Sequence, residues 1–65
     1  MSDLVDVIEV RIKAPHVVRV MATRKTAENA EAFINMAIAR RGVETHFYKT
    51  APVGQYPDDG EEHQP

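Results

Sequence analysis

Glu44 and His46 are the pair of residues in this sequence whose types and spacing best fit chemistry. Two apart on a strand, they point to the same side, so the carboxylate can orient the imidazole as a general base. The same spacing is common on exposed strands. Ser2 is the only serine, cysteine is absent, and no glycine-rich phosphate loop or G-x-S-x-G motif occurs. We therefore predict no catalytic residues and a non-enzymatic protein.

Metal binding is the second chemistry to consider. The three histidines, His16, His46 and His63, are scattered over a turn, a strand and the C-terminal region, and no pair has helical ligand spacing. Glu44 with His46 offers two ligands, whereas zinc sites use three or four preorganised donors. We predict no metal site and no cofactor.

Charge is distributed unevenly, although the formal net charge is only −2. All 8 basic residues lie between Arg11 and Lys49, where only Glu28, Glu31 and Glu44 oppose them. Both ends of the chain are acidic. Such a basic middle favours either anion binding or simple solubility.

The length of 65 residues limits the chain to one domain with a thin core. A chain of this size buries about 60% of the surface exposed by its unfolded form, and small domains compensate with disulfides, metals or oligomerisation. Without cysteine, oligomerisation remains. No stretch reaches the roughly 18 apolar residues that span a bilayer, and the N-terminus lacks a signal-peptide pattern. We expect a cytoplasmic protein that does not enter the membrane.

Alternating apolar residues predict three strands. The first runs from about Leu4 to Lys13, with a slip in alternation near Val7–Ile8 that indicates either a bulge or a frayed strand start. Ala14–Pro15–His16 forms the hairpin corner. The second strand covers about Val17 to Thr23, and the third covers Val43 to about Thr50.

One helix is predicted between the second and third strands, over Ala27–Arg41. Thr26 is a suitable N-cap, the last turn contains basic residues that suit the helix dipole, and Gly42 suits the position after the end. An apolar stripe along the helix follows the spacing i, i+3, i+4, i+7, i+8 and is expected to pack on the sheet: Ala30, Phe33, Ile34, Ala37 and Ile38.

These elements predict an α+β fold: a small ββαβ domain with a three-stranded antiparallel or mixed sheet, one helix on one face, and an open opposite face. The domain covers residues 1–51. Residues 52–65 carry three prolines, two glycines and four acids, which predicts a disordered acidic tail without packed structure.

Function is expected on the open face, because one helix covers only one face of the sheet. Alternation assigns Val18 to the core beneath the helix and places on the opposite, open face Glu9, Arg11, Lys13, Val17, Arg19, Met21, Thr23, His46 and Tyr48. The binding residues that we predict are Arg11, Lys13, Val17, Arg19, Met21, His46 and Tyr48.

Two hypotheses compete for this face. In the first, Val17, Met21 and Tyr48 form the centre of a protein interface with Arg11 and Arg19 at its rim, used by a homodimer or a larger protein partner. In the second, basic strand residues neutralise the phosphates of a single-stranded nucleic acid while Tyr48 stacks on a base. The first is our prediction, and nucleic-acid binding is the alternative.

Overall fold

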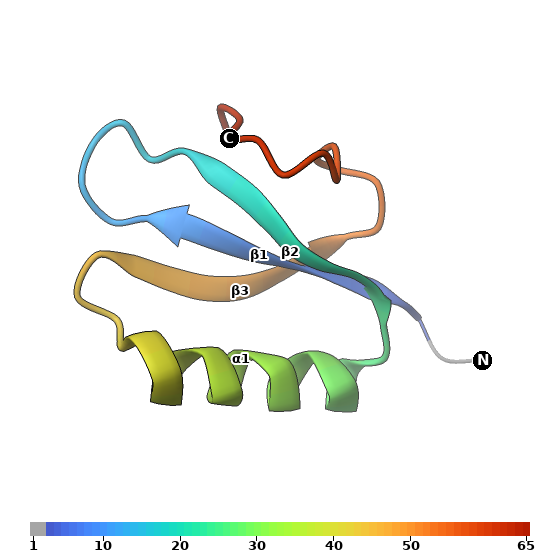
Figure 1. Cartoon of the computed structure of the whole chain (residues 1–65). Coiled ribbons are helices and arrows are strands. Elements are labelled where there is room, and N and C mark those ends of the chain that lie inside the picture. Colours follow the sequence, from blue (N-terminus) through green and yellow to red (C-terminus); the bar gives the residue numbers. More distant parts are fainter. Residues whose placement is uncertain (1–2) are drawn as a thin grey trace.

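The structure is a computed structural model that describes residues 3–65, and it consists of three strands and one helix (Figure 1). In chain order these are β1 (Val5–Arg11), β2 (Val18–Lys25), α1 (Ala27–Arg41) and β3 (His46–Pro52). The predicted α+β fold of ββαβ type is confirmed. Within the described part of the chain, no helix is both long and apolar enough to cross a membrane.

The sheet is fully antiparallel, with strand order β2-β1-β3, so that β1 is the central strand. β1 pairs with β3 in one unbroken register, in which Glu9 lies opposite Tyr48. Its register with β2 shifts on either side of Val7, so of the two explanations for the slip in alternation the structure shows the bulge. Beyond the bulge, Arg24 adopts a φ of 52° in the left-handed region.

Helix α1 has the bounds that its capping residues predict. The side chain of Thr26 accepts a hydrogen bond from the N–H of Asn29 at 3.2 Å, which satisfies one of the unpaired donors of the first turn. At the other end Gly42, with a φ of 74°, donates its N–H to the carbonyl of Ile38 at 2.7 Å. A positive φ at this position favours glycine, so the helix stops here.

The strand ends differ from the predicted ones by a few residues. β2 continues to Lys25, and β3 begins at His46 instead of Val43. The later start of β3 follows from pairing, because β1 ends at Arg11 and the last pair in the β1–β3 register joins Arg11 to His46. The residues between Gly42 and His46 form the connection from the helix.

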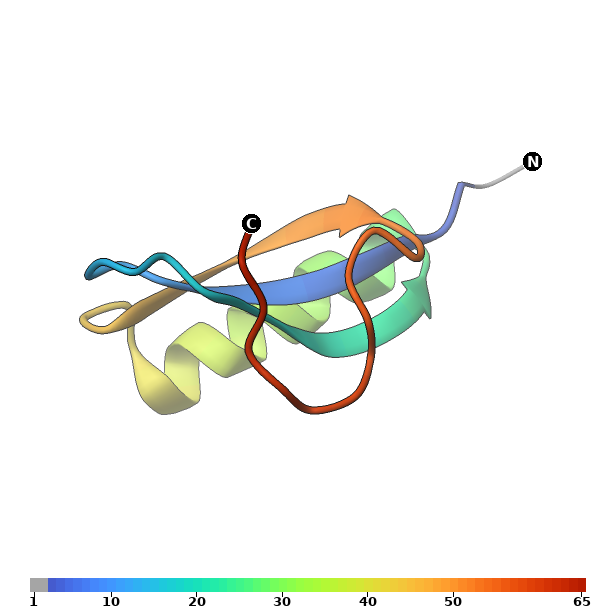
Figure 2. The same cartoon turned by 90° about the horizontal axis from the view of Figure 1, so that it is seen from above.

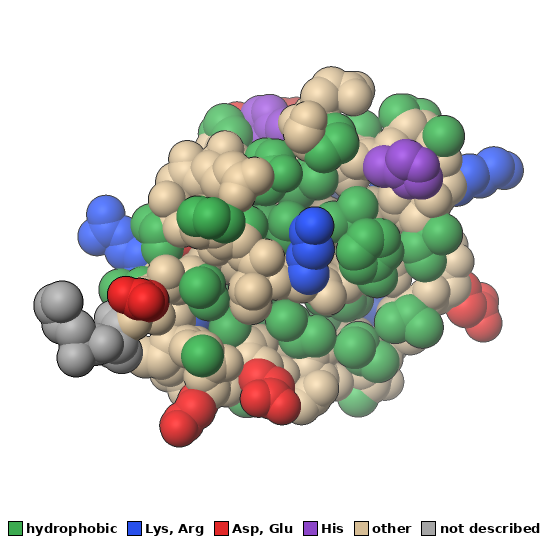
Figure 3. Space-filling view, turned by 180° about the vertical axis from the view of Figure 1, so that it is seen from behind, with side chains coloured by type: hydrophobic (Ala, Val, Ile, Leu, Met, Phe, Trp, Pro, Cys, Tyr) green, Lys and Arg blue, Asp and Glu red, His purple; other side chains and the backbone are tan. Residues whose placement is uncertain are grey.

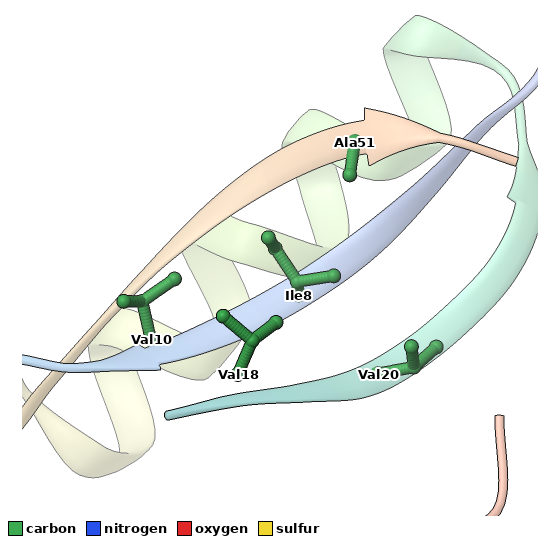
Figure 4. Close-up of a cluster of buried hydrophobic side chains, with 5 residues drawn as sticks. All are labelled: Ile8, Val10, Val18, Val20 and Ala51. Carbon is green, nitrogen blue, oxygen red and sulfur yellow. The ribbon is translucent and has the colours of Figure 1, made fainter. Parts of the chain in front are cut away.

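The buried apolar cluster lies on the face of the sheet opposite α1, which corrects the predicted assignment of the two faces (Figure 4). This cluster consists of Ile8, Val10, Val18, Val20 and Ala51. The helix instead covers the face that carries Glu9 and Met21. Both faces of β1 and β2 contain valine or methionine, so alternation could not distinguish the side that receives the helix.

The helix stripe itself is only partly covered by the sheet. Ala30 is fully buried, Phe33, Ile34 and Ala37 are half-buried, and Ile38 is 38% exposed. The predicted stripe therefore faces the sheet. The sheet face that it contacts is the one carrying Glu9 and Met21, which we had predicted to be open to a partner.

The C-terminal segment, residues 53–65, crosses the face of the sheet opposite α1 (Figure 2). Tyr56 packs against the apolar cluster, and His63 forms an antiparallel bridge with Val18 through two backbone hydrogen bonds of 2.8 Å. Nε2 of His63 also lies 2.8 Å from Oδ1 of Asp59, and this contact holds the pKa of that carboxyl below its usual 3.8. These contacts differ from the expectation of a tail without packed structure over residues 52–65.

Candidate functional site

Glu9 lies at the centre of a cluster of polar and charged side chains. Its carboxylate is buried on the helix side of β1. Oε1 is 3.1 Å from Nη2 of Arg19, and Oε2 is 3.2 Å from Nη1 of Arg41. The hydroxyl of Tyr48 donates to Oε2 at 3.0 Å. These groups come from β1, β2, α1 and β3, so the Glu9 cluster joins all four elements.

Tyr48 is held neutral by this arrangement. Burial and the hydrogen bond to Glu9, in that order, raise the pKa of its phenol above the usual 10.0, while Arg41 acts in the opposite direction. The phenol therefore remains a donor to the carboxylate throughout the physiological pH range.

A hollow of about 380 Å³ opens beside the Glu9 cluster. Nε2 of His46 lies 4.0 Å from Oε1 of Glu9, and its Nδ1 is 3.0 Å from the hydroxyl of Thr45. The C-terminal segment contributes Glu62 to the lining. Two carboxylates therefore face two guanidinium groups in this hollow, which leaves no excess of positive charge to attract an anion.

The contacts of the Glu9 cluster have a structural role. Both carboxylate oxygens already accept from charged or hydroxyl donors, and no buried side-chain polar atom in residues 3–65 lacks a partner. Nor does any group of three or more His, Cys, Asp or Glu side chains in that range gather closely enough to hold a metal ion. The cluster fixes the C-terminal end of α1 to the sheet through Arg41.

Three of the predicted binding residues, Arg19, His46 and Tyr48, meet around Glu9. Arg11 and Lys13 lie instead at the hairpin end of the sheet, where they line a second hollow together with His46. The five residues that we placed at the centre and rim of an open face thus lie on the helix side or near the hairpin. Their roles in binding stay predictions.

Met21 and Val17 complete the predicted set. Met21 lines a small apolar hollow between β2 and α1, together with Phe33 and Met36. Val17 is half-buried in the turn before β2, and its carbonyl accepts the N–H of Arg11 at 3.0 Å. Neither belongs to the Glu9 cluster.

Glu9 and Asp6, the two buried acids, were not among the predicted site residues. Asp6 is 2% exposed, and its carboxylate accepts the backbone N–H of Arg24 and that of Gly54, each at 3.1 Å. The signal in the sequence was an acid between valines or isoleucines in the middle of a strand. Such an acid is buried only when partners satisfy it.

The outer edge of β3 is a free edge of the sheet in the described part of the chain. The N–H of Ile12 donates to the carbonyl of Thr45 at 3.0 Å, which sets the phase of the β1–β3 ladder. Hydrogen-bonded and non-hydrogen-bonded pairs alternate in an antiparallel ladder, so the N–H and C=O groups of His46, Tyr48 and Thr50 point away from β1. Within residues 3–65, no strand pairs with this edge.

Exposed apolar side chains flank that edge. Phe47, which is 39% exposed, and Val53 lie on or just after β3, and Ile38 lies on the flank of α1. Figure 3 shows hydrophobic side chains spread over this side of the molecule. The β2 edge differs, because His63 already pairs with it at Val18.

Comparison with protein families, with characterised proteins and with solved structures found no match.

Proposed function

We propose that this protein is a small non-enzymatic interaction module that binds an extended polypeptide along the outer edge of β3. The supporting observation is the row of outward N–H and C=O groups at His46, Tyr48 and Thr50, flanked by exposed apolar side chains. Strand addition uses such an edge, because backbone hydrogen bonds supply affinity and side-chain contacts supply specificity. The absence of cysteine is consistent with action in the cytoplasm.

The proposed binding surface is the outer edge of β3, whereas the sequence predicted an open face of the sheet. Two of the residues first expected to bind, His46 and Tyr48, belong to the proposed edge. Two others are engaged elsewhere: Arg19 is paired with Glu9, and Met21 packs beside α1. For the same reason, we do not carry nucleic-acid binding forward as a second function. Tyr48 is only 8% exposed and donates to Glu9, so its ring is not presented to a base.

The experiment is a selection of random linear peptides against the full chain, followed by mapping of backbone amide shifts by NMR. We expect the selected peptides to shift the amides of His46, Tyr48 and Thr50 most. Thr50→Pro removes one outward N–H without touching the ladder to β1, so it should abolish binding, whereas Thr50→Ala should retain it. Selected peptides that bind Thr50→Pro as well as the natural chain would overturn the proposal.

A further inference from the structure

The outer edge of β3 also fits a second copy of itself. We propose that two chains associate through their β3 strands, antiparallel, in a register centred on Tyr48, to form one six-stranded sheet. This inference rests on the proposed function, since it names the polypeptide that the edge receives. A strand that pairs with its own copy about a two-fold axis gives a closed dimer.

The register follows from which backbone groups point outward. Only His46, Tyr48 and Thr50 present hydrogen-bonding groups to this edge before Pro52, which has no N–H to donate. Centred on Tyr48, the pairing joins Tyr48 to the partner's Tyr48 and His46 to the partner's Thr50. Every outward N–H and C=O group of His46, Tyr48 and Thr50 is then used.

Side-chain charge selects the same register. On the face opposite α1, Lys49 comes to lie opposite the partner's Phe47, where the ammonium group and the aromatic ring attract. Moving the pairing by two residues toward the C-terminus sets Lys49 against the partner's Lys49, and like charges directly opposite are destabilising. Moving it toward the N-terminus leaves the N–H of Thr50 without a strand partner.

The helix side is compatible with this dimer. α1 packs about equally on β1 and β3, so its axis lies about one strand spacing, ~4.8 Å, from the two-fold axis. The two helices would then be about 10 Å apart, which is a normal packing distance. Helical geometry turns Ile38 toward β3, away from the Met21 side, so this exposed side chain faces its copy.

Association would also remedy a thin core. The fully or nearly buried apolar side chains are few, the helix stripe is half-covered, and Phe47 and Ile38 remain exposed in the single chain. An isolated three-stranded sheet with one loosely covered face gains stability when these side chains are removed from water.

Disulfide trapping tests the register directly, because the natural chain contains no cysteine. Residues 47 and 49 of opposite chains form a non-hydrogen-bonded pair with Cα atoms about 4.5 Å apart, within the range for a disulfide. Residue 47 and its copy are diagonal neighbours, about 7–8 Å apart. The experiment mixes tagged Phe47→Cys chains with untagged Lys49→Cys chains and oxidises them.

We expect nearly all covalent dimers to be mixed, instead of the half that random collision gives. Covalent dimers from Phe47→Cys alone, formed as fast as in the mixture, would overturn the register. Sedimentation of the natural chain should give twice the 7.3 kDa mass, and Thr50→Pro should halve it while retaining the circular dichroism spectrum. A monomer at millimolar concentration overturns the dimer. If selected peptides still bind the β3 edge of that monomer, the proposed function stands without it.

Discussion

The carboxylate of Asp6 accepts the backbone N–H of Gly54 at 3.1 Å, across 48 positions of sequence. Its other oxygen accepts the N–H of Arg24, a residue whose φ of 52° is unfavourable for a side chain larger than glycine. One buried carboxylate thus holds both the irregular end of β2 and the start of the C-terminal segment.

Asp6→Asn is expected to lower the free energy of unfolding by about 1.5–3 kcal/mol, the range for hydrogen bonds to a charged group. The asparagine amide keeps one acceptor oxygen, but its NH₂ group cannot accept the second backbone N–H. Urea unfolding measures the change, and Asp58→Asn, at an exposed position, is the control. Equal effects of the two substitutions would contradict the anchoring role of Asp6.

Tyr56→Ala should destabilise the protein by about 1–2 kcal/mol, because the half-buried ring covers the apolar cluster on the face opposite α1. Gln55→Ala, at the exposed neighbouring position, should change stability by less than about 0.5 kcal/mol. Thermal unfolding of the two variants is the measurement. If Tyr56→Ala unfolds at the same temperature as the natural chain, the C-terminal segment does not pack in solution.

Arg41→Ala should cost more stability than Arg40→Ala, although the two arginines are adjacent in the last turn of α1. Arg41 pairs with the buried carboxylate of Glu9, but its own side chain is 57% exposed, so we expect a loss of about 1 kcal/mol. Arg40 should contribute only through the helix dipole, about 0.3–0.5 kcal/mol. Matching losses in urea unfolding would show that the pair with Glu9 adds nothing.

Alkaline pH should destabilise the protein through Tyr48. The pKa of its phenol is raised in the folded state, so the neutral form is favoured there and its contribution is complete below pH 10.0. As pH rises above 10.0 the unfolded chain loses this proton first, and stability falls until the folded phenol also ionises. Absorbance titration of tyrosinate in Tyr56→Phe isolates Tyr48, and a midpoint at or below 10.0 would contradict the prediction.

The helix could be predicted to the residue, because its signals are local. Thr26, the basic last turn and Gly42 each act on backbone groups within a few positions. The bulge beside Val7 was also visible, as two adjacent apolar residues on a strand that otherwise alternates. The three strands could likewise be predicted from local alternation of apolar residues, although their bounds differ from the predicted ones by a few residues.

The side of the sheet that receives the helix could not be predicted, because it depends on contacts between distant segments. Val7 and Ile8 are both fully buried, so the two faces of β1 are equally apolar at that point. What decides is the pairing of Glu9 with Arg41 on one side and the packing of Tyr56 on the other. The apolar neighbours of Glu9 indicate a buried acid, but nothing in the sequence identifies Arg41 as its partner, and the Glu9 cluster was missed for that reason.

The bridge between His63 and Val18 bears on how far chains can assemble. A sheet with two free edges can add copies head to tail without limit, and such growth produces filaments. Here His63 pairs with the β2 edge at Val18 and the β3 edge stays accessible, so the proposed β3–β3 association would end at two chains. If the proposed dimer forms, loss of the last residues would free the β2 edge at Val18 and let further chains add.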